Sequence, residues 1–159
     1  MRSKAGRGDS SMEPVMSAEN DRELEKLTNR WKKEVFAFCK TYLGEVAAAE
    51  EATCDAFAAL YRERGLTTRD GDALARLLGL ALRAMENRQN GSSQSLQPTS
   101  RLESAIQRLP RLERAVVIMR NLLHMEWISI ASGTDVSRSQ AHKAWVRGIF
   151  QLNDLLQKS

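Results

Sequence analysis

The first part of the chain carries apolar residues at every third or fourth position, in three separate stretches. They cover residues 24–42, 46–61 and 74–85, and Gly44 and Gly65 stand shortly after the first two. This spacing places the apolar side chains on one face of a helix, and glycine commonly ends helices. No stretch has the period of two that is typical of a half-buried strand. The pattern therefore predicts a bundle of three helices.

In the last part of the chain, the residues typical of helix starts indicate where the helices begin. Ser100 with Glu103 forms one capping box, and Ser137 with Gln140 forms another. In a capping box the Ser hydroxyl and the Glu or Gln side chain each accept a hydrogen bond from a backbone N–H at the helix start. Pro110 stands where another helix can begin, because a proline in the first turn loses no intrahelical hydrogen bond. With a short apolar segment before the second box, these signals predict four helices.

These patterns divide the chain into four segments. We expect residues 1–16 to form a disordered leader and residues 17–90 to form the three-helix domain. Residues 91–100 contain Gly, Pro and several Ser or Thr residues, a composition that is typical of a flexible linker. Residues 101–159 form the four-helix domain. The predicted fold class is all-α, with two small helical domains joined by a flexible linker.

The composition argues against membrane and secreted proteins. The chain is 42% apolar and 28% charged, and no window approaches the roughly 18 to 20 consecutive apolar residues that a membrane span needs. No apolar stretch follows the basic residues at the amino terminus, so we do not expect a signal peptide. We therefore expect a cytoplasmic protein without membrane insertion.

The chain also lacks the residue patterns of common catalytic and metal sites. Its thiols are Cys39 and Cys54 and its imidazoles are His124 and His142, and their spacing matches no metal-binding motif. It contains neither a nucleophile paired with a base nor a glycine-rich phosphate loop. We therefore predict no enzyme activity, no metal and no cofactor. Core packing, and not ligand stacking, is expected of Trp31, Trp127 and Trp145.

The net charge of +4 is concentrated in the last third of the chain. Residues 101–159 carry nine basic and five acidic side chains, whereas residues 17–90 carry twelve basic and thirteen acidic ones. A locally basic segment is typical of proteins that bind a polyanion. By itself the charge pattern is also compatible with an ordinary solvated surface.

The segment from Trp127 to Phe150 has the pattern of a helix-turn-helix. A short helix containing Ile130 and Ala131 precedes a turn at residues 133–135, and the capped last helix follows. In this motif the amino-terminal end of the second helix enters the major groove of DNA. Arg and Gln side chains there can read guanine and adenine edges, while Ser and Lys suit phosphates. The candidate DNA-contacting residues of this helix are Arg138, Ser139, Gln140, His142, Lys143 and Arg147.

Four short motifs follow one another along the second domain: Leu109 and Pro110, Glu113 and Arg114, Ile130 and Ala131, and Ser137. They match a Leu-Pro opener, a Glu-Arg pair, an Ile-Ala pair in the first helix of the helix-turn-helix, and a Ser that opens the recognition helix. With these motifs the second domain resembles the promoter-binding domain of bacterial sigma factors of the extracytoplasmic-function group. The first domain is similar to the polymerase-binding domain of the family in residues 42–44 and 49–57. Together the matches span about residues 20–157, in the domain order of the family.

The resemblance implies a dissociable subunit of core RNA polymerase that directs initiation at specific promoters and is regulated by an anti-sigma factor. The second helix would dock on the clamp helices of the largest polymerase subunit through Glu50, Glu51 and Asp55. The third helix would lie near the minus-ten element of promoter DNA, with Arg76, Arg83 and Arg88 off its apolar stripe. The recognition helix would hold the minus-thirty-five element.

The chain departs from the family pattern at several positions. Cys54 stands where the family usually has Gln, and Asp135 replaces the Gly of the turn. Asp tolerates the left-handed backbone conformation better than most residues, so we expect the turn to form. Ala144 and Gly148 stand where the family often has Arg and Ala, which we interpret as a thinning of the basic face. Residues 65–90 contain no aromatic side chain, although aromatic faces commonly capture unstacked bases.

These departures leave two alternatives to a sigma factor. One is a sigma-like mimic that binds an anti-sigma factor and does not melt DNA. The other is a free helix-turn-helix regulator that binds operators without polymerase. Promoter binding that depends on core polymerase would separate a sigma factor from a free regulator.

Overall fold

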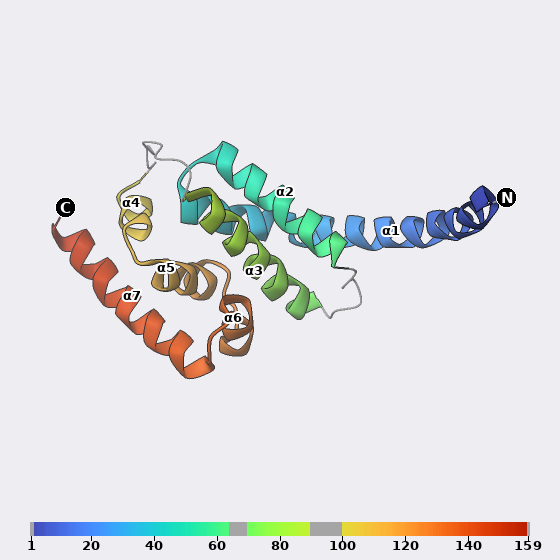
Figure 1. The fold of residues 1–159 in the computed structure, drawn as a ribbon. Helices are drawn as coiled ribbons and strands as arrows, with labels where there is room; N and C mark the ends of the chain where they lie inside the picture. The colour runs from blue at the N-terminus through green and yellow to red at the C-terminus, as the bar shows by residue number, and fades with distance from the viewer. Residues whose placement is uncertain (1, 64–69, 90–99, 159) are drawn as a thin grey trace.

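The computed structural model is entirely helical over the part of the chain that it describes (Figure 1). The backbone is described for residues 2–63, 70–89 and 100–158, and the side chains for residues 21–63, 73–87 and 100–158. Within these ranges there are seven α-helices, one π-helical segment and no strand. The all-α prediction is therefore confirmed.

Three helices form the first bundle: α1 (Arg2–Leu43), α2 (Val46–Arg62) and α3 (Asp70–Gln89). Gly44 ends α1 as predicted, because its φ of 82° is accessible to glycine and strained for other residues. The predicted apolar faces are buried, and the fully buried side chains include Val35, Phe38, Tyr42, Leu60, Leu77, Leu78 and Met85. Gly65, predicted to end the second helix, lies outside the described residues.

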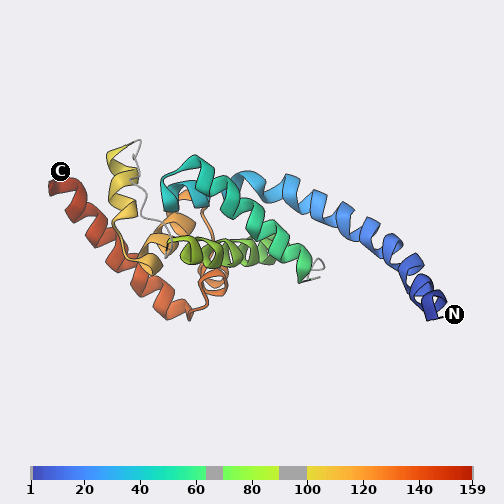
Figure 2. The same cartoon turned by 45° about the horizontal axis from the view of Figure 1, so that its top comes forward.

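The predicted disordered leader differs from the structure. Helix α1 continues back to Arg2, so residues 2–16 have helical backbone. Extending an existing helix needs no new nucleus, because each added residue forms one more backbone hydrogen bond. The composition of residues 1–16 alone does not reveal that a helix begins directly after them and can be extended through them. This part of α1 projects beyond the rest of the molecule in both views (Figure 1 and Figure 2).

The second bundle contains α4 (Arg101–Gln107), α5 (Arg111–Val117), the π-helical segment η1 (Ile118–Leu122), α6 (Trp127–Thr134) and α7 (Arg138–Lys158). Ser100 caps α4 by accepting a hydrogen bond from the backbone N–H of Glu103 at 3.1 Å. Pro110 stands directly before α5, as expected from its missing N–H. The four predicted helices of this domain are all present.

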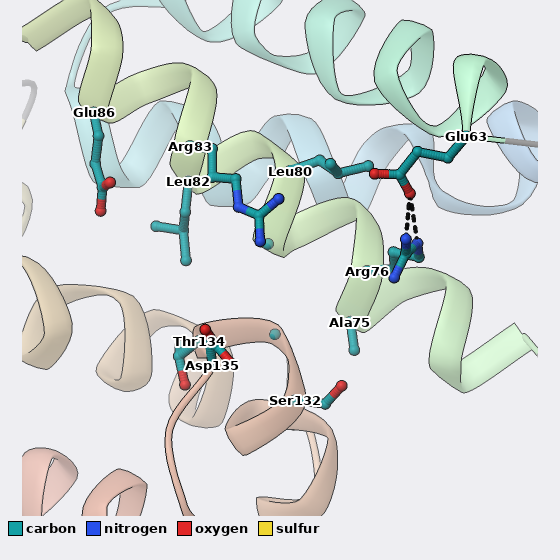
Figure 3. A pocket seen from close by; sticks show the side chains of 12 residues that line it. Glu63, Ala75, Arg76, Leu80, Leu82, Arg83, Glu86, Ser132, Thr134 and Asp135 are labelled. Carbon is teal, nitrogen blue, oxygen red and sulfur yellow. Dashed lines mark hydrogen bonds and ion pairs between the residues drawn. The ribbon is translucent and has the colours of Figure 1, made fainter. Parts of the chain in front are cut away.

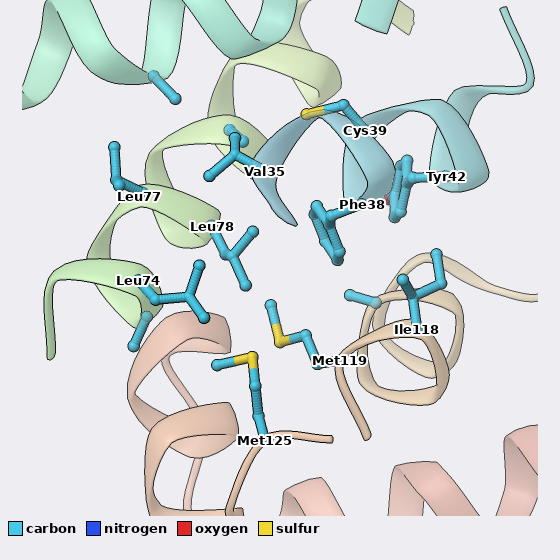
Figure 4. Close-up of a cluster of buried hydrophobic side chains, with 14 of the residues drawn as sticks. Val35, Phe38, Cys39, Tyr42, Leu74, Leu77, Leu78, Ile118, Met119 and Met125 are labelled. Atoms are coloured by element: carbon cyan, nitrogen blue, oxygen red, sulfur yellow. The ribbon is translucent and has the colours of Figure 1, made fainter. Parts of the chain in front are cut away.

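The two bundles pack against each other and share one apolar core. Met119 and Met125 of the second bundle lie against Phe38, Leu74 and Leu78 of the first (Figure 4). The predicted linker is residues 91–100, and all of it except Ser100 lies outside the described residues. The described helices of the two predicted domains form one packed unit, and the linker between them stays a prediction.

Candidate nucleic-acid interface

Helices α6 and α7 meet at a tight turn that fits a helix-turn-helix. Asp135 follows α6 with φ 58° and ψ 45°, the left-handed conformation expected for it from the sequence. The backbone N–H of Val136 then donates to the carbonyl of Ala131 at 3.1 Å, which closes the end of α6. Ile130 and Ala131 are buried, so the small Ala side chain lies inside the motif.

The start of α7 is held by the predicted capping box, with both of its hydrogen bonds formed. The backbone N–H of Gln140 donates to the Ser137 hydroxyl at 3.1 Å, and the backbone N–H of Ser137 donates to the Gln140 side-chain oxygen at 2.9 Å. Two N–H groups that a helix start leaves unpaired are thereby satisfied. The backbone of the first turn of α7 is therefore held in place, and so are the starting positions of its side chains.

The candidate DNA-contacting side chains of α7 share its outward face. Arg138, Ser139, Gln140, His142, Lys143 and Arg147 are all exposed. The opposite face buries Ala141, Ala144 and Gly148 in the domain. From residue 136 to residue 149 the chain has three basic side chains and no acidic one. Because this stretch of α7 has no acidic side chain, no negative charge on the helix repels a polyanion that approaches the outward face.

The structure corrects the interpretation of Ala144 and Gly148 as a thinning of the basic face. Both residues are buried, and a Cβ on Gly148 would lie 2.7 Å from Cγ2 of Val117. Small residues are needed here because α5 and α7 pack so closely. Neither position can carry a side chain to DNA, so neither affects the basic face.

Arg147 is tied to its own domain more firmly than the sequence suggests. Its guanidinium lies 3.0 Å from Oε1 of Glu113, a carboxylate on α5 whose residue is 8% exposed. A nearly buried carboxylate is costly without a cation, so Arg147 compensates Glu113. The Arg147 side chain nevertheless remains about half exposed.

An aromatic cluster fixes the position of His142. The ring centroid of Trp127 lies 5.1 Å from that of His142 in an edge-on arrangement, and that of Trp145 lies 6.1 Å away. The Arg120 guanidinium lies over the Trp127 ring, 4.8 Å from its centroid, and the Trp145 indole N–H donates to the side-chain oxygen of Asn121 at 2.8 Å.

The sequence pattern predicts only core packing for Trp127. In the structure Trp127 is half-buried and lines a shallow hollow together with Arg138, Ser139 and His142. The spacing of His142 and Trp145 on one helix face is visible in the sequence. Trp127 joins them only through the turn, which no pattern of spacing reveals.

Arg76 and Arg83 of α3 line a polar cleft of about 410 Å3 between α3 and α6 (Figure 3). Arg76 is bound to Glu63, with its Nε donating at 2.8 Å. Arg83 lines the same cleft, opposite Asp135 of the helix-turn-helix. The side chain of Arg88 lies outside the described residues. The structure thus brings Arg76 and Arg83 to one groove.

The acidic candidates of α2 lie together on its exposed face. Glu50, Glu51 and Asp55 are exposed, and so is Cys54 between them. The opposite face of α2 is buried, and there the Thr53 hydroxyl donates to the carbonyl of Ala49 at 2.7 Å. This geometry offers a row of carboxylates to a basic partner.

Other chemistry is not evident in the described residues. No three His, Cys, Asp or Glu side chains gather there to hold a metal ion. None of the described helices combines the length and the apolar character that crossing a membrane requires.

Comparisons with known proteins bear on the fold. No protein-family model matches the chain, and no curated protein matches it in sequence. Among solved structures, it is similar to the sigma factor RpoE of Bartonella quintana, in a co-crystal structure with the anti-sigma factor NepR. The similarity covers 90% of this chain and 97% of that chain, with a TM-score of 0.59 and 13% sequence identity. The chain therefore has a sigma-factor-like fold.

Proposed function

We propose that the chain is a sigma factor of the extracytoplasmic-function group, which binds core RNA polymerase and directs initiation at specific promoters. The observation that carries this proposal is the helix-turn-helix within a sigma-factor-like fold. Its second helix starts at a complete capping box and turns an acid-free basic face outward. A free-standing regulator would need the same helix, but not the preceding bundle with its acidic row.

In this proposal, α7 enters the major groove at the minus-thirty-five element. Arg138 and Gln140 are on the first turn, where side chains reach base edges. Ser139 and Lys143 suit the phosphates on either side, which fix register and carry no sequence information. His142 is held by Trp127 and Trp145 and so presents a preoriented donor or acceptor.

The first bundle provides the contacts with polymerase and with the minus-ten element. Glu50, Glu51 and Asp55 would meet the basic clamp helices of the largest polymerase subunit, and complementary charges there would speed encounter and set register. Arg76 and Arg83 would lie near the minus-ten element. In this proposal the chain supplies no catalytic group and needs no cofactor, because nucleotide addition belongs to the core enzyme. The chain would act together with that enzyme in the cytoplasm.

A competition for core RNA polymerase tests the proposal. A labelled principal sigma factor is bound to the core enzyme, and this chain is titrated in while the released label is followed. We expect complete displacement with a single binding isotherm. A folded chain that displaces no label at large excess would overturn the sigma assignment.

A second candidate function is a sigma-like mimic that binds an anti-sigma factor. The observation that favours it is an apolar groove of about 340 Å3 that α1, α4, η1 and α7 line together. Leu102 and Leu122 on its rim are about half exposed. Tight anti-sigma binding by a chain that does not bind core polymerase would establish this candidate. Operator binding without polymerase would instead identify a free regulator.

A further inference from the structure

The start of α7 borders a shallow hollow of about 350 Å3 on the outward face of the helix-turn-helix. Its lining consists of Arg138, Ser139 and His142 of α7 and of Trp127 of α6. The three α7 residues are exposed, and Trp127 is half-buried. The proposed function assigns the α7 residues to DNA as separate contacts, but it gives no reason for an accessible aromatic ring among them.

Contacts from the π-helical segment η1 hold the aromatic wall of this hollow in place. The Arg120 guanidinium lies over the Trp127 ring and donates to the Met125 carbonyl at 2.8 Å. The next residue, Asn121, accepts the indole N–H of Trp145, and the Trp145 ring packs edge-on against Trp127 with centroids 5.8 Å apart. π-Helical turns are frequent at functional sites. The wall is therefore fixed in the free protein and does not have to be ordered by a ligand.

The hollow suits a small apolar group that projects from a polar surface. The Trp127 ring gives it an apolar wall, and Arg138 and Ser139 give it a polar edge. In the major groove of DNA every base pair presents polar donors and acceptors, and thymine alone adds an apolar group, its C5 methyl. An aromatic ring gains contact area against this methyl group. The hollow therefore matches thymine better than the other three bases.

Arg138 connects the hollow to the reading of bases. It is the first residue of α7, where side chains reach base edges, and it borders the hollow. Stacked base pairs are about 3.4 Å apart, so a group beside the Arg138 side chain faces the same base pair or the next one. Residues 136–149 carry three basic side chains and no acidic one, which favours DNA over a free apolar molecule as the occupant.

We propose that this hollow is a subsite for the C5 methyl group of a thymine beside the base that Arg138 reads, and that Trp127 determines specificity there. The inference rests on the proposed function and deepens it, because it adds a thymine requirement at one position of the bound DNA. Trp127 then contacts DNA itself, in addition to supporting His142. Burial of one methyl group shifts a binding equilibrium about fourfold, which sets the size of the preference.

Replacement of thymine by uracil tests the subsite, because it removes only the methyl group and keeps every hydrogen-bonding group of the base pair. A pool of duplexes of randomised sequence is enriched for binding to core polymerase that carries the full chain. The tightest duplex is then synthesised with uracil in place of one thymine at a time. We expect a thymine contacted by α7 at which uracil weakens binding about fourfold.

Variants of the hollow assign this effect to Trp127. Trp127→Ala removes the aromatic wall, and Ser139→Leu fills the hollow with an apolar side chain. Both should bring the ratio of uracil to thymine dissociation constants at that position close to one, while Trp127→Phe should keep most of the preference. Phe150→Ala is the matched control, because Phe150 is an exposed aromatic residue of the same helix outside the hollow.

The ratio remains informative if a variant is less stable than the wild type. Each ratio compares two duplexes with the same protein, so a smaller folded fraction lowers both affinities alike. Ser139→Leu changes an exposed residue and keeps the test open if Trp127→Ala does not fold.

Two outcomes would overturn the subsite. One is selective binding in which no thymine is sensitive to uracil. The other is a uracil-sensitive position that keeps its ratio in both Trp127→Ala and Ser139→Leu. Either outcome leaves the proposed function standing, because the duplex is still bound selectively. If the chain with core polymerase selects no duplex at all, the proposed function fails and the subsite fails with it.

Discussion

The two thiols of this chain lie in opposite surroundings although they are close in sequence. Cys39 is completely buried, and this burial raises its pKa from 9.0 to about 12 despite a hydrogen bond with Thr53. Cys54 is exposed on the acidic face of α2. The sequence pattern does not predict this difference in burial, because burial depends on which face of the bundle each thiol occupies.

The Cys39 thiol makes the stability of the fold sensitive to alkaline pH. Its folded pKa lies above the unfolded value, so its contribution is complete below pH 9 and is lost as pH rises towards 12. Between pH 8.5 and 10.5, we expect the wild type to lose about 2 kcal/mol more unfolding free energy than Cys39→Ala. Urea unfolding of both proteins at each pH measures this difference, and parallel pH profiles would contradict it.

Arg138 is the residue with the clearest proposed contact to a base. Its side chain is exposed at the first turn of α7, and its removal leaves the capping box intact. We expect Arg138→Ala to weaken promoter binding by about 1 to 3 kcal/mol if it reads a base edge. Arg22→Ala, an exposed arginine of α1, is the control. Equal promoter footprints for the two variants would remove Arg138 from the interface.

At the scale of elements, the start of α7 connects local sequence to the proposed reading of DNA. Ser137→Ala removes the hydroxyl that accepts the N–H of Gln140. We expect a loss of about 1 kcal/mol in unfolding free energy and weaker promoter binding from a frayed first turn. Thermal or urea unfolding measures the first effect, with Ser139→Ala, an exposed serine of the same turn, as the control. Equal stability of the two variants would show that the box contributes nothing.

The helices themselves follow from local patterns, and so do most of their ends. Gly44, Pro110 and Ser137 mark boundaries because their conformational or hydrogen-bonding properties act within a few residues. The roles of Ala144 and Gly148 could not be found in this way. Their smallness reflects the close approach of α5, a contact between segments distant in sequence.

At the scale of the whole molecule, the acidic row of α2 and the basic face of α7 lie on separate helices of one packed unit. We expect the double charge reversal Glu51→Lys and Asp55→Lys to weaken displacement of a principal sigma factor by at least tenfold, because opposite charges would become like charges. The same competition titration measures it, and urea unfolding checks that the fold persists. Unaltered displacement by the folded variant would contradict the assignment of α2 to polymerase.

Apart from residues 2–16 of α1, the sequence by itself determined the helices, their caps, the left-handed turn at Asp135 and the basic outward face of α7, because each depends on neighbours within about one or two turns. Only the tertiary structure decided that Arg147 compensates a nearly buried Glu113, that Trp127 supports His142, and that the two bundles share a core. These contacts join residues distant in sequence. Their existence depends on the direction in which whole helices pack, which a pattern along the chain does not contain.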